Sequence, residues 1–116
     1  MTQYFHGGRK LVAHSGLCLT EDFDAALAYS QGRGDTVHAV DMDLDGLTVR
    51  HVKITREMVD SDSYPGDTAR ERAALIAEGV DVLTYDDCDP NGRTSRTIRL
   101  ISDAALALVV DAYEVE

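Results

Sequence analysis

Apolar residues in this chain come in short runs that alternate with polar residues, and this pattern favours a fold built on a β-sheet. The clearest case is Thr36–Met42, where Val37 and Ala39 point to one face of a strand. Val40 and Met42 point to the other face. Because side chains alternate along a strand, such a segment packs apolar residues on both sides of a sheet.

Similar runs predict further strands on both sides of this one. They cover Thr2–Phe5, Gly16–Thr20, Leu47–Ile54, Asp81–Tyr85 and Thr97–Ile101. Asp81–Tyr85 and Thr97–Ile101 form a predicted hairpin with a long acidic loop that ends in the turn sequence Asp-Pro-Asn-Gly. Leu106–Val115 predicts a last strand, although its apolar density also permits a helix.

Two segments have helical rather than strand-like spacing. The first contains Phe23 and Ser30, can be capped by Thr20 or Asp22, and stops before the glycine at position 32. The second runs from about Asp67 to Glu78, and the glycine at position 79 provides a left-handed C-cap. A further helical turn is expected over 102–105. The sequence therefore predicts one α+β domain over residues 1–116, with six or seven short, mostly antiparallel strands and two helices.

Composition narrows the choice of partners. The chain has 116 residues, of which 44% are hydrophobic, which is enough for one buried core. Its 21 acidic and 11 basic residues give a net charge of −10, which disfavours nucleic acid and suits a basic protein partner. No apolar run is long enough for a membrane span, and the first residues lack the pattern of a secretory signal. We therefore expect a cytoplasmic protein that contacts no membrane.

Cysteines and histidines give no sign of a disulfide framework or a metal site. Cys18 and Cys88 are too few and too far apart in sequence for a disulfide scaffold, and we interpret both as structural thiols. His14, His38 and His51 lack the mutual spacing of zinc ligands. We expect no bound metal.

Three short motifs near the start of the chain carry the strongest functional signal. His6-Gly7-Gly8 follows the first predicted strand, and Gly16–Thr20 forms the second. Tyr29 lies on the first predicted helix, nine positions after Thr20. Each motif is short, but their order and spacing together are specific.

In this order the motifs resemble the His-Tyr-Glu branch of the ADP-ribosyltransferase superfamily, which includes diphtheria toxin and the poly(ADP-ribose) polymerases. Two later segments, Gly79–Tyr85 and Thr97–Ser102, look like strands found in small bacterial and phage members. The resemblance covers nearly the whole chain. It implies an ADP-ribosyltransferase-like fold and a mono-ADP-ribosyltransferase that transfers ADP-ribose from NAD⁺ to a macromolecule, with a protein as the expected acceptor. Stand-alone members of this size suit a role in conflict between phages and bacteria.

The resemblance also implies roles for individual residues. The family histidine, matched by His6, donates a hydrogen bond to a ribose hydroxyl of the adenosine half. Gly7 offers its backbone groups to the nicotinamide amide, and Tyr29 stacks on the pyridinium ring. Arg33 can meet the pyrophosphate if its loop borders the cleft. The expected NAD-binding residues are His6, Gly7, Gly8, Leu17, Cys18, Thr20, Tyr29 and Arg33.

Two family residues are missing. The helix serine that binds the nicotinamide amide is replaced by Ala26, at a cost of about 1 kcal/mol. The catalytic glutamate is replaced by Arg96 or Ser95, and an arginine has the wrong charge to steady an oxocarbenium ion.

Three aspartates of the acidic loop can supply the missing carboxylate by folding back over the cleft, and we favour the second of them. They are Asp86, Asp87 and Asp89. The competing interpretation is that an Asp-rich turn is only a turn. Three hypotheses therefore remain: a transferase, a catalytically inactive relative that binds NAD, a nucleotide or a protein, and an unrelated interaction module.

Overall fold

The alternating runs pair into one seven-stranded sheet. In the computed structural model, which describes residues 1–8, 10–31, 36–88, 92 and 94–115, the strands are β1 (Thr2–Gly7), β2 (Leu17–Thr20), β3 (Val37–Met42), β4 (Val49–His51), β5 (Val82–Cys88), β6 (Thr94–Leu100) and β7 (Tyr113–Val115). Their order is β4-β5-β6-β2-β1-β3-β7. All neighbours are antiparallel except β4 and β5, so the predicted α+β class and strand number are confirmed.

Four helices occur in the described part of the chain. They are α1 (Phe23–Ser30), α2 (Arg56–Asp60), α3 (Ala69–Ala77) and α4 (Asp103–Leu106). The first, third and fourth match predicted segments, and the left-handed glycine after α3 has φ +79° as expected. α2 was not predicted, because it is a single short turn of mostly polar residues with no apolar stripe. None of these helices is long and apolar enough to cross a membrane.

Several predicted boundaries are wrong. Of the strand expected over Leu47–Ile54, only Val49–His51 pairs, as β4. The last strand was expected over Leu106–Val115, but only Tyr113–Val115 pairs with β3. The β5–β6 hairpin is longer than expected, because pairing continues from Asp86 with Arg96 to Cys88 with Thr94. Asp86 and Asp87 therefore belong to a strand and not to the loop. Polar side chains do not stop strand pairing when the backbone groups of both strands bond to one another.

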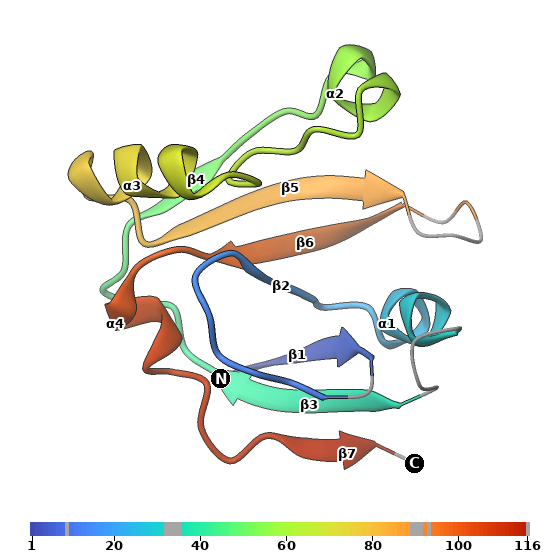
Figure 1. Ribbon diagram of the computed structural model, residues 1–116. Helices are drawn as coiled ribbons and strands as arrows, with labels where there is room; N and C mark the ends of the chain where they lie inside the picture. The colour runs from blue at the N-terminus through green and yellow to red at the C-terminus, as the bar shows by residue number, and fades with distance from the viewer. Residues whose placement is uncertain (9, 32–35, 89–91, 93, 116) are drawn as a thin grey trace.

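The sheet is nearly divided between β1 and β2. These strands pair only at Phe5 with Thr20, whereas β1 pairs with β3 at six positions and β2 with β6 at four. Figure 1 shows β4, β5, β6 and β2 on one side of this junction and β1, β3 and β7 on the other, with α1 beside it. The junction between the two halves is where the candidate site lies.

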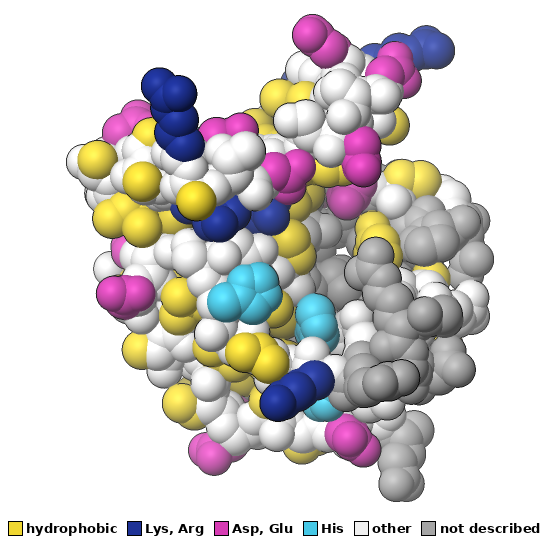
Figure 2. All heavy atoms as spheres, in the orientation of Figure 1, with side chains coloured by type: hydrophobic (Ala, Val, Ile, Leu, Met, Phe, Trp, Pro, Cys, Tyr) yellow, Lys and Arg dark blue, Asp and Glu magenta, His cyan; other side chains and the backbone are white. Residues whose placement is uncertain are grey.

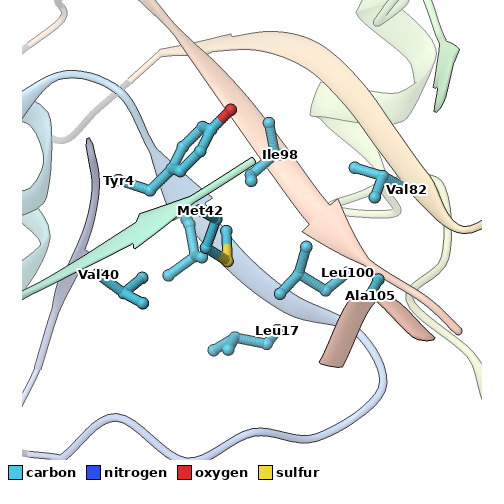
Figure 3. Close-up of a cluster of buried hydrophobic side chains, with 9 residues drawn as sticks. Tyr4, Leu17, Val40, Met42, Val82, Ile98, Leu100 and Ala105 are labelled. Atoms are coloured by element: carbon cyan, nitrogen blue, oxygen red, sulfur yellow. The ribbon is translucent and has the colours of Figure 1, made fainter. Parts of the chain in front are cut away.

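The main hydrophobic core covers one face of both halves. Figure 3 shows its side chains converging from several strands, with Ala105 of α4 at the edge. The set alternates along each strand and comprises Tyr4, Leu17, Leu19, Val40, Met42, Val82, Ile98, Leu100 and Ala105. Since this core joins strands from both halves, it holds the divided sheet together on the face opposite α1.

Candidate functional site

A cleft of about 240 Å³ opens on the other face of the sheet, over the junction of the two halves. Alternation decides which side chains reach it. In β6 the cleft is lined by Thr97 and Arg99, and in β5 by Tyr85 and Asp87, so odd-numbered residues of both strands face it. The remaining lining residues are Phe5, His6, Gly7, Cys18, Leu19, Thr20, Ala26, Tyr29, Tyr64 and Asp67.

His6 bridges the gap between β1 and β2. Its Nδ1 lies 3.3 Å from the carbonyl oxygen of Cys18. A carbonyl can only accept, so this contact favours the tautomer with the proton on Nδ1, in which Nε2 is an acceptor. Burial lowers the pKa of His6, an effect that the bond to Cys18 only partly opposes, so the neutral ring is favoured. The backbone of Lys10 also hydrogen-bonds the ring and, like Cys18, opposes the lowering of the His6 pKa. In the tautomer protonated on Nδ1, His6 would accept a hydrogen bond from a ligand hydroxyl, whereas the family resemblance implies that it donates one.

Gly7 is required by helix packing. A Cβ on Gly7 would lie 1.9 Å from the carbonyl oxygen of Ala26 and 2.8 Å from the backbone nitrogen of Ser30, far inside contact distance. Buried alanines at 25, 26 and 28 let α1 approach β1 this closely. Sequence reasoning attributed the glycine to ligand access, but the close approach of α1 is sufficient to require it.

The backbone of Gly7 is also directed toward the junction. The N–H of Gly8 donates to the carbonyl of Thr36 at 2.8 Å, beside β3. Because backbone groups alternate in an antiparallel ladder, the N–H and C=O of Gly7 point away from β3, toward β2. The recorded pairing of β1 with β2 is at Phe5 and does not include Gly7. These two polar groups thus border the cleft.

Tyr29 of α1 reaches across the cleft to β5. Its hydroxyl donates to Oδ2 of Asp87 at 3.4 Å and to the carbonyl oxygen of Cys88 at 3.3 Å. Oδ1 of Asp87 accepts from the backbone N–H of Cys88 at 2.8 Å. These bonds fix the Asp87 carboxylate next to the tyrosine ring, at the cleft wall.

The three candidate acids differ in their position relative to the cleft. Asp87 lines the cleft, whereas Asp86 points to the opposite face and pairs with Arg96 at 2.9 Å. Asp89 lies outside the described residues. Asp87 pairs directly across the hairpin with Ser95, so the two side chains share the cleft face. Ser95 is therefore the cleft-side residue at the position expected for the glutamate, and the charge of Arg96 does not face the cleft.

The base of the cleft holds two neutral polar groups. The Cys18 thiol lies 3.6 Å from the hydroxyl of Tyr85. Burial raises the pKa of Cys18, and burial likewise raises the pKa of Tyr85 far above its ordinary value. Both groups stay protonated at neutral pH, so Cys18 is not an activated nucleophile.

The opposite wall is a turn around Pro65, whose place in the site the sequence did not predict. Residues 64–67, which we call the Tyr64 turn, form a turn with Pro65 second and Gly66 third, and Gly66 has φ +81° as a type II turn requires. Arg99 donates to the Pro65 carbonyl at 3.0 Å and to Asp67 at 2.6 Å. The signal in the sequence was Arg99 itself, a charged residue between two buried apolar positions of one strand.

The remaining predicted residues lie at the border of the cleft or away from it. Gly8 does not line the cleft, but a Cβ on it would come within 3.4 Å of His6 Nε2, so the glycine keeps that nitrogen accessible. Leu17 is 2% exposed and belongs to the hydrophobic core, which corrects its assignment to the binding site. Arg33 lies outside the described residues. Thr20 lines the cleft, and its hydroxyl accepts from the N–H of Asp22, which is the residue that caps α1.

Within the described ranges, no group of three or more His, Cys, Asp or Glu residues is arranged to hold a metal ion. No protein-family model, curated protein or solved structure matches this chain.

Proposed function

We propose that this protein binds NAD⁺ in the cleft and acts as a mono-ADP-ribosyltransferase on a macromolecular acceptor, with a protein as the expected acceptor. One observation carries the proposal. Five residues that sequence motifs alone associated with NAD⁺, namely His6, Gly7, Cys18, Thr20 and Tyr29, come from three different elements and line one cleft together with Asp87.

The chemistry of the cleft suits the nicotinamide end of NAD⁺. Its charged side chains are Asp67, Asp87 and Arg99, which sum to −1, and Arg99 is already paired with Asp67. The unpaired charge is therefore the Asp87 carboxylate beside the Tyr29 ring, which favours a cationic planar group. The backbone N–H and C=O of Gly7 match the acceptor and donor of a carboxamide.

The size of the cleft also limits what it can enclose. At about 240 Å³ it is smaller than the roughly 300–1,000 Å³ of typical small-molecule sites, so it holds the nicotinamide riboside part only. The adenosine half extends outward past His6, whose Nε2 accepts from a hydroxyl. No unengaged basic side chain lines the described part of the cleft, and we expect modest affinity for the pyrophosphate.

NAD⁺ supplies an ADP-ribosyl group whose bond to nicotinamide breaks with the electron pair leaving on the nicotinamide nitrogen. The chain contributes position and charge. Tyr29 and Gly7 orient the leaving ring, and the Asp87 carboxylate stabilises the positive charge that grows on the ribose. Asp87 then accepts the proton that the acceptor nucleophile loses when its new bond to the ribose carbon forms.

A second candidate, an inactive NAD-binding relative, is favoured by one observation. The cleft-side residue at the expected glutamate position is Ser95, and Asp87, which replaces the acid from the neighbouring strand, is already bonded by Tyr29 and the Cys88 N–H. A carboxylate held in this way has less freedom to reach a ribose.

The two candidates are separated by incubating the purified protein with NAD⁺ labelled in the nicotinamide ring. The transferase predicts release of free nicotinamide together with a rise in melting temperature in NAD⁺. The inactive relative predicts the thermal shift without release. If neither occurs, the cleft does not bind NAD⁺ and the proposal is wrong.

A further inference from the structure

A second depression lies directly beside the cleft. It has a volume of about 630 Å³, opens along α2, and shares Tyr64 with the cleft. We call it the α2 groove, and it is lined by Val52, Thr55, Glu57, Met58, Ser61, Ser63, Tyr64, Pro65 and Glu71. Because the Tyr64 side chain borders both the groove and the cleft, a peptide segment of a partner that lies in the groove would place its following residues at the cleft.

The groove exposes apolar surface that the fold leaves uncovered. No residue of α2 is buried, and Figure 1 shows this helix projecting from the body of the molecule. Met58 and Val52 are only half-buried, and the neighbouring Val59 is 52% exposed. A helix without buried residues adds little to the stability of the domain, so its apolar side chains are available for contact with a partner.

The base of the groove is nevertheless firmly built. The Tyr64 turn is held from one side by Arg99 and from the other by Arg72, whose Nη1 donates to the carbonyls of Gly66 and Asp67, each at 2.9 Å. Glu71 accepts from the N–H of Gly66 at 3.0 Å. These bonds make the groove a preformed surface and not a loosely packed region.

Charge identifies the class of occupant. Two carboxylates, Glu57 and Glu71, line the groove, and no basic side chain does so among the described residues. Arg56 at the start of α2 pairs with Asp60 at 3.8 Å, four residues on. The acidic character continues into the cleft through Asp67 and Asp87. Figure 2 shows acidic side chains over this end of the molecule as well as around the rest of the visible surface. A second copy of the chain, with its own net charge of −10, is electrostatically unsuited to this surface.

We propose that the α2 groove docks a basic, apolar segment of the acceptor protein and leads it past Tyr64 into the cleft. Apolar residues of the segment contact Val52 and Met58, and a lysine or arginine pairs with Glu57. The catalytic consequence rests on the proposed transferase activity. Docking itself does not, because the groove exists without NAD⁺.

Docking is tested with a short fluorescent peptide of alternating arginine and leucine, titrated with the protein in the absence of NAD⁺ and followed by anisotropy. We expect saturable binding that weakens as salt is raised. Glu57→Lys should weaken it by about tenfold, since like charges then face each other. Met58→Gln, which keeps the charge, should weaken it severalfold. The same peptide with glutamate in place of arginine should not bind.

Asp45→Lys is the matched control, because it makes the same charge change on an exposed loop away from the groove. Equal binding by Glu57→Lys and Asp45→Lys would mean that the peptide senses only the overall acidity, and the proposal would fall. It would also fall if sedimentation showed a dimer that Met58→Gln dissociates. Nicotinamide release without peptide is measured separately, so failure of docking and failure of the enzyme reaction are distinguishable.

Discussion

The two walls of the cleft are built in different ways. On one side α1 packs on β1 through buried alanines and Gly7, and the Phe5 and Phe23 rings meet edge to face with their centroids 5.5 Å apart. On the other side the Tyr64 turn is held by Arg99, Arg72 and Glu71 through charge-assisted hydrogen bonds, next to helices that bury no residue. The helix wall depends on close packing, and the turn wall on polar bonds.

Because the two walls are built differently, substitutions in them should affect folding stability and ligand binding to different degrees. A substitution in the helix wall should alter both the fold and the site, because a side chain added at Gly7 would displace α1. Substitution of Asp87 should act mainly on the ligand, because its carboxylate bonds only side chain and backbone groups at the cleft wall and lies outside the hydrophobic core. The predictions below use this contrast.

The largest effect is expected at Asp87. Replacement of Asp87 by Asn keeps the shape but removes the charge that stabilises the ribose cation, so nicotinamide release should fall by about two to three orders of magnitude. NAD⁺ binding, measured by thermal shift, should weaken far less than turnover, because the variant loses only the attraction between the carboxylate and the cationic ring. Asp86→Asn is the matched control, because its side chain lies on the other face with Arg96. Equal release by both variants and the parent would remove Asp87 from catalysis.

Gly7→Ala should damage the fold instead. The new methyl would overlap the Ala26 carbonyl, so we expect a loss of about 3 kcal/mol, the upper end for overpacking, and a fall in melting temperature of more than about 10 °C. Gly79→Ala is the comparison, because its Cβ meets nothing and only its left-handed φ is penalised, at about 1 kcal/mol. A Gly7→Ala protein that melts like the parent would show that α1 can yield.

The sequence predicted those features of the structure that depend on interactions between residues close in sequence. Alternation located the strands, the Asp22 side chain marked the start of α1, and the motif order brought His6, Gly7 and Tyr29 to one site. Asp87 was preferred over Asp86 and Asp89, but all three were expected to lie in a loop. Only the register of the hairpin, which pairs it with Ser95, places it on the cleft face. Register depends on the partner strand and is not encoded in the acidic segment alone.

The position of the turn wall could not be predicted, because the residue that holds the turn in place is distant in sequence. The Pro65 carbonyl and the Asp67 carboxylate are held by Arg99, more than thirty residues later in the chain. The pair Pro65-Gly66 indicates a turn, but not which surface that turn covers. Leu17 shows the reverse error, since it lies within a functional motif and yet faces the core.

Tyr29→Ala tests the contact between the helix wall and β5. Loss of the ring should weaken NAD⁺ binding by about 1–2 kcal/mol, in the range of desolvated cation–π contacts. Tyr29→Phe keeps the ring and loses the weak bonds of the hydroxyl to Asp87 and Cys88, so it should retain most of the affinity. Isothermal titration gives both values. If Phe and Ala weaken binding equally, the hydroxyl and not the ring is what matters.

His6 should make NAD⁺ binding depend on pH. Its pKa in the folded protein is lowered from the ordinary value of about 6.5, and only the neutral ring can accept the ligand hydroxyl. Affinity should therefore hold at and above about pH 6.5 and decline as the pH falls through the lower folded value. His6→Ala should lose about 1 kcal/mol of binding and show no such decline. His14→Gln controls for a neighbouring histidine that also opposes protonation of His6. A decline that persists without His6 would assign the titration elsewhere.

The smallest effect is expected at Arg96, the residue whose charge first argued against an enzyme. Arg96 and Asp86 form an ion pair with both side chains about half exposed, on the face of the hairpin that turns away from the cleft. Exposed pairs of this kind contribute about 0–1 kcal/mol, so Arg96→Ala should shift the melting temperature only slightly. Nicotinamide release and NAD⁺ affinity should both match the parent. Ser95→Glu is the informative companion, because its side chain shares the cleft face with Asp87 and would place a second carboxylate there. If Ser95→Glu raises release while Arg96→Glu does not, the orientation of β6 is correct. If Arg96→Ala alone changes turnover, the hairpin presents the other face to NAD⁺, and Asp86 would replace Asp87 as the catalytic candidate.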